Sequence, residues 1–286
     1  PDVRTVEKVL RSMHGKRVSY DIETDGQHPL LCQVRCIAFF GGARAICVPF
    51  LYRDGSTEQV IVEGKKKPIT RRLWKPFYTG KALGRVLAAM QALFDDASTR
   101  FETQNGQYDR MCLKARFGLI ASYALGKHLD TILAHHIVAG YLPHDLGFLA
   151  TLYTDAPFYK ATEGGDSWAS ESDAELWLYC CRDVRVTYIA ATKLREELKE
   201  RAEDVALYQH DAWQESQCQQ WRENGVYVDL EALDYFRFFY AGARDKALAA
   251  LKAIVQRRAE GNVRAGSALE TLLARIATPD VEEDSS

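Results

Sequence analysis

The segment that most constrains this chain lies near its N-terminus, where three apolar residues alternate with Ser19, Asp21 and Glu23. A period of two predicts a β-strand. Residues two apart on a strand point to the same face, so Asp21 and Glu23 place two carboxylates side by side. Such a pair is costly unless a cation neutralises it or one acid takes up a proton. Mg²⁺ and Mn²⁺ prefer oxygen ligands, and we expect this strand to supply half of a divalent metal site. The alternative is a strand end whose acids face water.

Composition limits the classes of protein to which the chain can belong. Its 286 residues are 47% hydrophobic and 27% charged, which is typical of a globular protein with one large domain, or one domain and an appendage. The net charge of −2 gives no overall attraction to nucleic acid or to an anionic membrane, so a polyanion would have to bind a local patch. No apolar run approaches the roughly 20 residues of a membrane span, and the N-terminus carries no hydrophobic secretory segment. We expect no membrane partner and no secretion.

Seven cysteines occur at irregular spacings and without a Cys-x-x-Cys pair. This pattern predicts neither a disulfide framework nor a structural zinc site. Most of these thiols lie in apolar runs, and we expect them to be small core residues in a reducing compartment.

The elements after the first strand predict a layered α/β domain. Residues 32–40 and 43–50 are apolar runs joined through Gly41 and Gly42, which is typical of a β-hairpin. Residues 81–94 have helical periodicity, and a short strand at 101–104 precedes a helix at 107–117. Strands that alternate with helices indicate a partly parallel sheet with helices packed on it.

Two later segments carry further acids. Asp109 falls in the first turn of the helix expected at 107–117, where an acid can also serve only to complement the helix dipole. A capping box at Ser172 starts a long helix that runs to about residue 202. Tyr179 and Asp183 stand four apart on that helix and therefore share one face. The alternative for this pair is an exposed acid beside a half-buried tyrosine.

A polar insertion at residues 52–80 is a candidate nucleic-acid contact. It interleaves aromatic residues with five basic ones, Lys65, Lys66, Lys67, Arg71 and Arg72. Cations pair with phosphates and aromatic rings stack on bases. A solvated loop with its aromatic residues tucked underneath fits the same pattern.

Composition also suggests how the chain is divided. We expect an α/β domain over residues 1–202, a helical appendage over 203–278 and an acidic, disordered tail over 279–286.

Three motifs thus occur in order: Asp21-x-Glu23, Asn105-x-x-x-Asp109 and Tyr179-x-x-x-Asp183. Their order, spacing and element types resemble the signature of the DEDD 3′–5′ exonucleases, in the subclass with tyrosine in the third motif. Within that superfamily the chain is most similar to the proofreading domain of family A DNA polymerases, the DNA polymerase I type. The runs at residues 129–131, 142–146 and 224–229 add to this similarity.

The resemblance implies a fold, a cofactor and a role for each motif residue. The fold is RNase H-like, a mixed five-stranded sheet flanked by helices, with a C-terminal appendage like the start of a polymerase thumb. The cofactors are two divalent cations, Mg²⁺ or Mn²⁺. One cation would be held by Asp21, Glu23 and Asp183, and the other by Asp21 and Asp109. Tyr179 would orient the attacking water. Four residues match positions that contact the 3′-terminal nucleotides: Thr24, Gln104, Asn105 and Tyr108.

We therefore expect a two-metal 3′–5′ exonuclease that converts single-stranded or frayed DNA 3′ ends to nucleoside monophosphates. Its role would be proofreading or DNA processing. We expect it in the cytoplasm or another reducing compartment that contains DNA. Only 57 residues follow Asp229, too few for a polymerase palm and fingers, so any polymerase would be a separate chain, unless the sequence is a fragment. The alternatives are an RNase D-like or Werner-type exonuclease acting on RNA or recessed duplex ends, and a non-catalytic module that holds DNA or a polymerase. A base-wedging leucine common in the family is replaced here by Gln27, with Leu30 and Leu31 further on.

Overall fold

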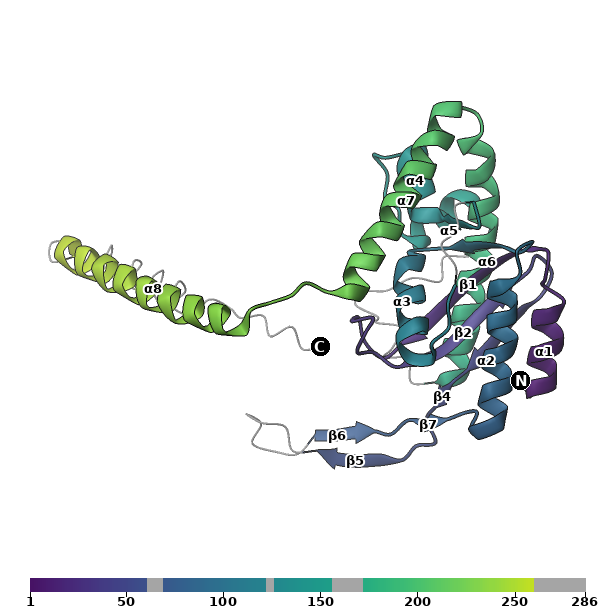
Figure 1. Ribbon diagram of the computed structural model, residues 1–286, viewed down its shortest axis with the longest axis horizontal. Coiled ribbons are helices and arrows are strands. Elements are labelled where there is room, and N and C mark those ends of the chain that lie inside the picture. Colours follow the sequence, from purple (N-terminus) through teal and green to yellow (C-terminus); the bar gives the residue numbers. More distant parts are fainter. Residues whose placement is uncertain (61–68, 122–125, 156–171, 260–286) are drawn as a thin grey trace. The chain divides into compact units, whose positions relative to one another are not determined.

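The computed structural model describes residues 1–60, 69–121, 126–155 and 172–259 of the chain. The chain divides into two compact units, Pro1–Glu223 and Asn224–Ser286. In the second unit the described structure is mainly one long helix, α8 (Leu230–Ala259). All the predicted motif residues lie in the first unit, which is built on a central sheet (Figure 1).

The central sheet has five strands in the order β3-β2-β1-β8-β9. The strands are β1 (Arg17–Thr24), β2 (Val34–Phe40), β3 (Ala45–Pro49), β8 (Arg100–Thr103) and β9 (His128–Asp130). The first three are antiparallel neighbours, and β8 and β9 run parallel to β1. The hairpin between β2 and β3 turns at Gly42, whose φ of 89° is readily adopted only by glycine. The predicted mixed five-stranded RNase H-like sheet is confirmed.

Helices cover both faces of this sheet. Helices α1 (Val3–Arg11) and α2 (Gly80–Asp95) lie together on one face, whereas α6 (Asp173–Leu198) packs against β1, β2 and β3 on the other (Figure 1). The remaining helices of this unit are α3 (Gly106–Phe117), α4 (Thr131–Val138), α5 (Leu146–Tyr153) and α7 (Ala202–Asn224). Two small hairpin-like sheets, β4 (Leu51–Tyr52) with β7 (Lys75–Pro76) and β5 (Thr57–Val60) with β6 (Ile69–Arg72), form the insertion. None of the helices in the described part of the chain could span a membrane.

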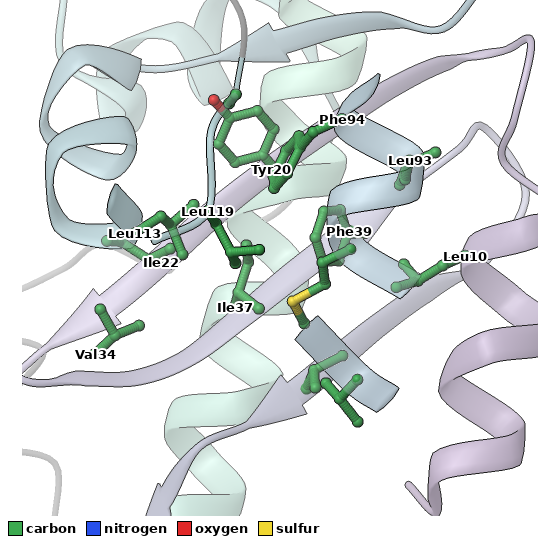
Figure 2. Packing of buried hydrophobic residues seen from close by; sticks show 14 of the residues in the cluster. Leu10, Tyr20, Ile22, Val34, Ile37, Phe39, Leu93, Phe94, Leu113 and Leu119 are labelled. Carbon is green, nitrogen blue, oxygen red and sulfur yellow. The ribbon is translucent and has the colours of Figure 1, made fainter. Parts of the chain in front are cut away.

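The alternation in β1 decides what lies on each face of the sheet. Its apolar residues Val18, Tyr20 and Ile22 enter the core beneath α1 and α2 (Figure 2). The Tyr20 ring meets Phe94 and Phe101 edge-on, with centroids 5.3 and 5.6 Å apart. Full burial of each such side chain contributes about 1.5–3 kcal/mol, so this face holds β1 firmly in register.

The polar residues of β1 occupy the opposite face, under α6. Ser19 is fully buried there, and its Oγ donates a hydrogen bond of 2.5 Å to the carbonyl of Val184 on α6. Asp21 and Glu23 follow on the same face, because they are two and four residues further along the strand. The sheet therefore presents both acids to α6.

Helix α7 belongs to the first compact unit. This unit runs to Glu223, and α7 packs onto the α/β core. The Arg110 guanidinium pairs with Glu215 of α7 at 3.0 Å, and the Tyr208 hydroxyl of α7 accepts a bond of 2.8 Å from the amide of Asp130. These polar contacts come from residues spaced along a helix that has little apolar periodicity of its own. The predicted acidic tail, 279–286, lies outside the described residues.

Candidate metal and active site

The centre of the candidate site is the end of β1. One carboxylate oxygen from Asp21, one from Glu23 and the Sγ of Cys180 all lie within 4.8 Å of one another. Glu23 is only 5% exposed, and Asp21 is half-buried. Cys180 donates weakly to the Asp21 carbonyl at 3.5 Å, and its Sγ is 3.8 Å from Asp21 Oδ2. The two acids thus lie side by side, as the strand pattern predicted.

Helix α6 carries the third motif to this place. Asp183 is 4% exposed and Tyr179 is half-buried, and Cys180 stands between them on the helix. The start of the helix is fixed on both sides: Ser172 caps the Glu175 amide at 3.4 Å, while the Asp173 carboxylate pairs with Arg35 at 3.1 Å and accepts from the Arg53 amide at 2.6 Å. The predicted helix start, with Ser172 as its N-cap, is confirmed. Because Cys180 touches Asp21, α6 brings the segment that carries Tyr179 and Asp183 next to β1. Asp183 does not join the group of Asp21, Glu23 and Cys180, whose ligand atoms lie within 4.8 Å of one another.

Asp109 lies in the first turn of α3 and is 4% exposed. Its Oδ2 is buried without a hydrogen-bond partner. Burial, and secondly the nearby Asp21 carboxylate, raise the pKa of Asp109 well above its ordinary value, against the opposing charge of Arg110. A buried, unpartnered carboxylate oxygen close to a second carboxylate suits a hard divalent cation. The residues present therefore fit the metal ions that the motifs imply.

The junction between β8 and α3 depends on Asp130, a residue for which the three motifs predict no role. Asn105 has the left-handed φ of 58°, and the Asp130 carboxylate accepts from the Asn105 and Gly106 amides at 3.3 and 2.7 Å. A Cβ on Gly106 would lie 2.3 Å from Thr103 Oγ1, so only glycine fits there. The run at residues 129–131 is part of the sequence resemblance, but its spacing does not predict that Asp130 binds the backbone before α3. Asp130 positions the turn that carries Asp109.

The four residues predicted to contact nucleotides divide into two pairs. The hydroxyls of Thr24 and Tyr108 are 2.8 Å apart, and both donate to the Gly26 carbonyl, at 2.8 and 2.6 Å. This links the end of β1 to α3. Gln104 is half-buried and donates to the His144 carbonyl at 2.8 Å, whereas Asn105 is exposed. Both hydroxyls and the Gln104 amide are thus already engaged within the protein.

A three-histidine group lies beyond Gln104. His144 Nδ1 is 2.7 Å from His135 Nδ1, and its Nε2 is 3.2 Å from His136 Nδ1. His144 therefore bridges the other two, which stand next to each other on α4. Burial first, and then a neighbouring histidine of the group, lower the pKa of His135 and of His144.

The basic insertion is only partly described. Lys65, Lys66 and Lys67 lie outside the described residues, and Arg71 and Arg72 stand on β6, where they pair in register with residues of β5. Two of its aromatic residues are engaged by the protein. The Trp74 ring lies 4.4 Å from the guanidinium groups of both Arg35 and Arg53, and Tyr78 is 6% exposed. These two rings match the alternative in which the aromatic residues are tucked underneath.

Known structures share this architecture. One is Escherichia coli RNase D, an exoribonuclease involved in structured RNA processing, with 14% identity and a TM-score of 0.52. A second is the catalytic core of RRP6 from Trypanosoma brucei, with 15% identity and a TM-score of 0.52. A third is the POL domain of Pol1 from M. smegmatis in complex with DNA primer-template and dNTP, with 15% identity and a TM-score of 0.57. The matches cover 78%, 76% and 88% of this chain. No protein-family model and no curated protein sequence matches the chain.

At these identities the similarity establishes the fold, which is the RNase H-like fold of RNase D. The chain spans 49% of the RNase D and RRP6 chains and 36% of the polymerase chain.

Proposed function

We propose that this chain is a metal-dependent 3′–5′ exonuclease that hydrolyses single-stranded or frayed DNA ends to nucleoside monophosphates. One observation carries the proposal. Two carboxylates of β1 lie within 4.8 Å of the same thiol, and a third, Asp109, is buried close enough for Asp21 to raise its pKa. Such a concentration of negative charge in a largely buried place is explained by cations that it is built to hold.

Each acid has a task in this proposal. Asp21, Glu23 and Asp183 would hold one cation, and Asp21 and Asp109 the other. When bound, two divalent cations supply an activated water and stabilise charge on the leaving oxygen of a phosphodiester. The Tyr179 hydroxyl would orient that water by a hydrogen bond, because a phenol stays protonated near neutral pH. Four carboxylates are about what two such cations need.

The substrate end would lie beside these acids. Thr24 and Tyr108, whose hydroxyls lie 2.8 Å apart, would contact it on one side, and Gln104 and Asn105 on the other. Leu30 and Leu31, which follow β1, are 42% and 66% exposed. Exposed apolar side chains at this position are suited to contact the faces of unstacked bases. The basic insertion, with Lys65, Lys66, Lys67, Arg71 and Arg72, would bind the strand further from its end.

RNA is the second candidate substrate. The observation in its favour is that RNase D, one of the structures with the same fold, is an exoribonuclease. The polymerase-like run at residues 224–229 favours DNA instead, and in that case a separate polymerase chain is the expected partner. All seven cysteines are free thiols, which supports a reducing compartment.

The experiment uses 5′-labelled oligonucleotides of one sequence as single-stranded DNA, RNA and blunt DNA duplex. The protein is compared with Asp21→Asn/Glu23→Gln, which removes two charges with little change of shape, and with Glu196→Gln, an exposed acid of α6. We expect a ladder shortening from the 3′ end with Mg²⁺ or Mn²⁺, absent with EDTA and in the double variant, and unchanged in the control. An oligonucleotide that is bound but stays intact with either metal would refute catalysis and identify a DNA-holding module. The relative rates on DNA and RNA decide the substrate.

A further inference from the structure

A second group of potential metal ligands lies beside the carboxylates. The Sγ atoms of Cys36, Cys47 and Cys180, the thiol cluster, all lie within 4.8 Å of one another. Cys36 and Cys180 are fully buried, and Cys47 is half-buried. A fourth thiol, Cys181, contacts Cys47 without joining this close group. Among the described residues, the other triad of potential ligands this close is Asp21, Glu23 and Cys180.

The fold brings these thiols together from three elements. Cys36 of β2 pairs in register with Pro49 of β3, and Cys47 pairs with Ala38. Cys36 and Cys47 are therefore diagonal neighbours on one face of adjacent strands. That face packs against α6, which contributes Cys180. Because each ligand comes from a different element, no Cys-x-x-Cys motif in the sequence predicts the thiol cluster.

The distances match those of a thiolate metal site. A tetrahedral zinc ion has Zn–S bonds of about 2.3 Å, which place its sulfurs about 3.8 Å apart. Sulfurs already within 4.8 Å of one another need only small side-chain rotations to reach that geometry. Two neighbouring thiols alone are not such a site, since the core pair Cys32 and Cys112 also has Sγ atoms 3.5 Å apart. The thiol cluster differs in that three sulfurs converge.

We propose that Cys36, Cys47 and Cys180 bind one thiophilic cation of the Zn²⁺ class, which enters from the side of the half-buried Cys47. On binding, the thiols release their protons and three sulfur–metal bonds form. The cation would join β2, β3 and α6 and so stabilise the face of the sheet that carries the candidate active site. This site is distinct in its ligands from the one for Mg²⁺ or Mn²⁺, because soft cations select sulfur and hard ones oxygen. It does not depend on the proposed exonuclease activity.

Cys180 belongs to both groups, since its Sγ is also 3.8 Å from Asp21 Oδ2. A cation could therefore occupy the carboxylate pair and use Cys180 alone. Variants separate the two cases, because Cys47 belongs only to the thiol cluster and Glu23 only to the carboxylate group.

The test is a titration of the reduced, metal-free full chain with Co²⁺, a spectroscopic substitute for Zn²⁺. Sulfur ligation gives a sulfur-to-cobalt charge-transfer band, which histidine or carboxylate ligation does not. We expect this band to saturate at one cobalt per chain and to be abolished by one equivalent of Zn²⁺. It should persist in Glu23→Gln and in Cys218→Ser, which removes the exposed cysteine of α7. It should be lost in Cys47→Ser, whose folding is checked by circular dichroism and by thermal unfolding without metal.

Two results would overturn the proposal. One is the absence of the band in the reduced wild-type chain, whether or not the chain degrades DNA with Mg²⁺. The other is a band that survives Cys47→Ser but is lost in Glu23→Gln, which would place the cobalt at the carboxylates with Cys180. A binding failure with intact Mg²⁺-dependent nuclease activity leaves the proposed function standing, so the two proposals fail separately.

Discussion

Replacing Asp109 by asparagine should stabilise the metal-free protein while weakening its response to metal. The side chain is 4% exposed, and its Oδ2 is buried without a hydrogen-bond partner. Burial and the Asp21 carboxylate raise the pKa of Asp109, which means that the folded protein favours the protonated acid. Stability is therefore lost as the pH rises above the ordinary carboxyl pKa near 4 and through the raised folded value. Asparagine at this position carries no such penalty.

The size of the effect follows from the buried charge. Leaving a buried polar group unsatisfied costs about 1–3 kcal/mol and more when the group is charged, so removing the charge recovers part of that cost. Arg110 offsets part of the charge, so we expect Asp109→Asn to gain about 2 kcal/mol at pH 8 without metal. For a unit of this size each kcal/mol raises Tm by about 2–4 °C, which gives a rise of about 4–8 °C.

Differential scanning calorimetry in EDTA, between pH 4.5 and 8.5, measures this difference. The gap in Tm between Asp109→Asn and the wild type should be small at pH 4.5 and widen toward pH 8.5. Glu196→Gln, an exposed control on α6, should follow the wild type throughout. Added Mg²⁺ should raise the Tm of the wild type more than that of Asp109→Asn. A variant that melts below the wild type at pH 8 in EDTA would refute the idea that this carboxylate is held ready for a cation.

Three further predictions concern other parts of the first unit. Burial lowers the pKa values of His135 and His144, which implies that stability is lost as pH falls below about 6.5. Urea midpoints at pH 7.5 and 5.5 should therefore differ less in His144→Gln than in the wild type, and equal differences would contradict this. Gly106→Ala should lower the free energy of unfolding by about 2–3 kcal/mol through overpacking against Thr103, whereas Gly84→Ala, in open space on α2, should raise it by about 0.5–1 kcal/mol. Chemical denaturation compares the two variants, and similar effects would argue against the close approach of Gly106 to Thr103. Tyr179→Phe should lower kcat by about 100–1,000-fold, since it removes a single oriented hydrogen bond, while the stabilisation by Mg²⁺ persists. Loss of both would make Tyr179 a structural residue instead.

Much of the first unit could be predicted because its signals are local. The period of two in β1, the Gly-Gly turn before β3 and the N-cap at Ser172 each act within a few residues, and each is confirmed. The end of the unit could not be predicted in this way. Helix α7 attaches through polar contacts such as Arg110 with Glu215, and a partner more than 100 positions away leaves no periodic trace in either segment.

The candidate site shows the same division. Asp21 and Glu23 could be paired from sequence because strand geometry alone sets their relation. The proximity of Cys180 to Asp21, and of Asp130 to the Asn105 and Gly106 amides, depends on how α6 and β9 pack on the sheet. Those contacts come from tertiary packing, so no short motif carries them.

The position of β1 in the sheet has a consequence for how the protein is made. Its partners on one side, β2 and β3, are complete by Pro49, but its other neighbour, β8, begins only at Arg100. At about 5–20 residues per second, a ribosome needs about 3–10 s to cover that interval. During this time the nascent sheet has an open edge along Val18 and Ser19, a place where another chain could pair. The polar insertion at residues 52–80 is synthesised in the same interval.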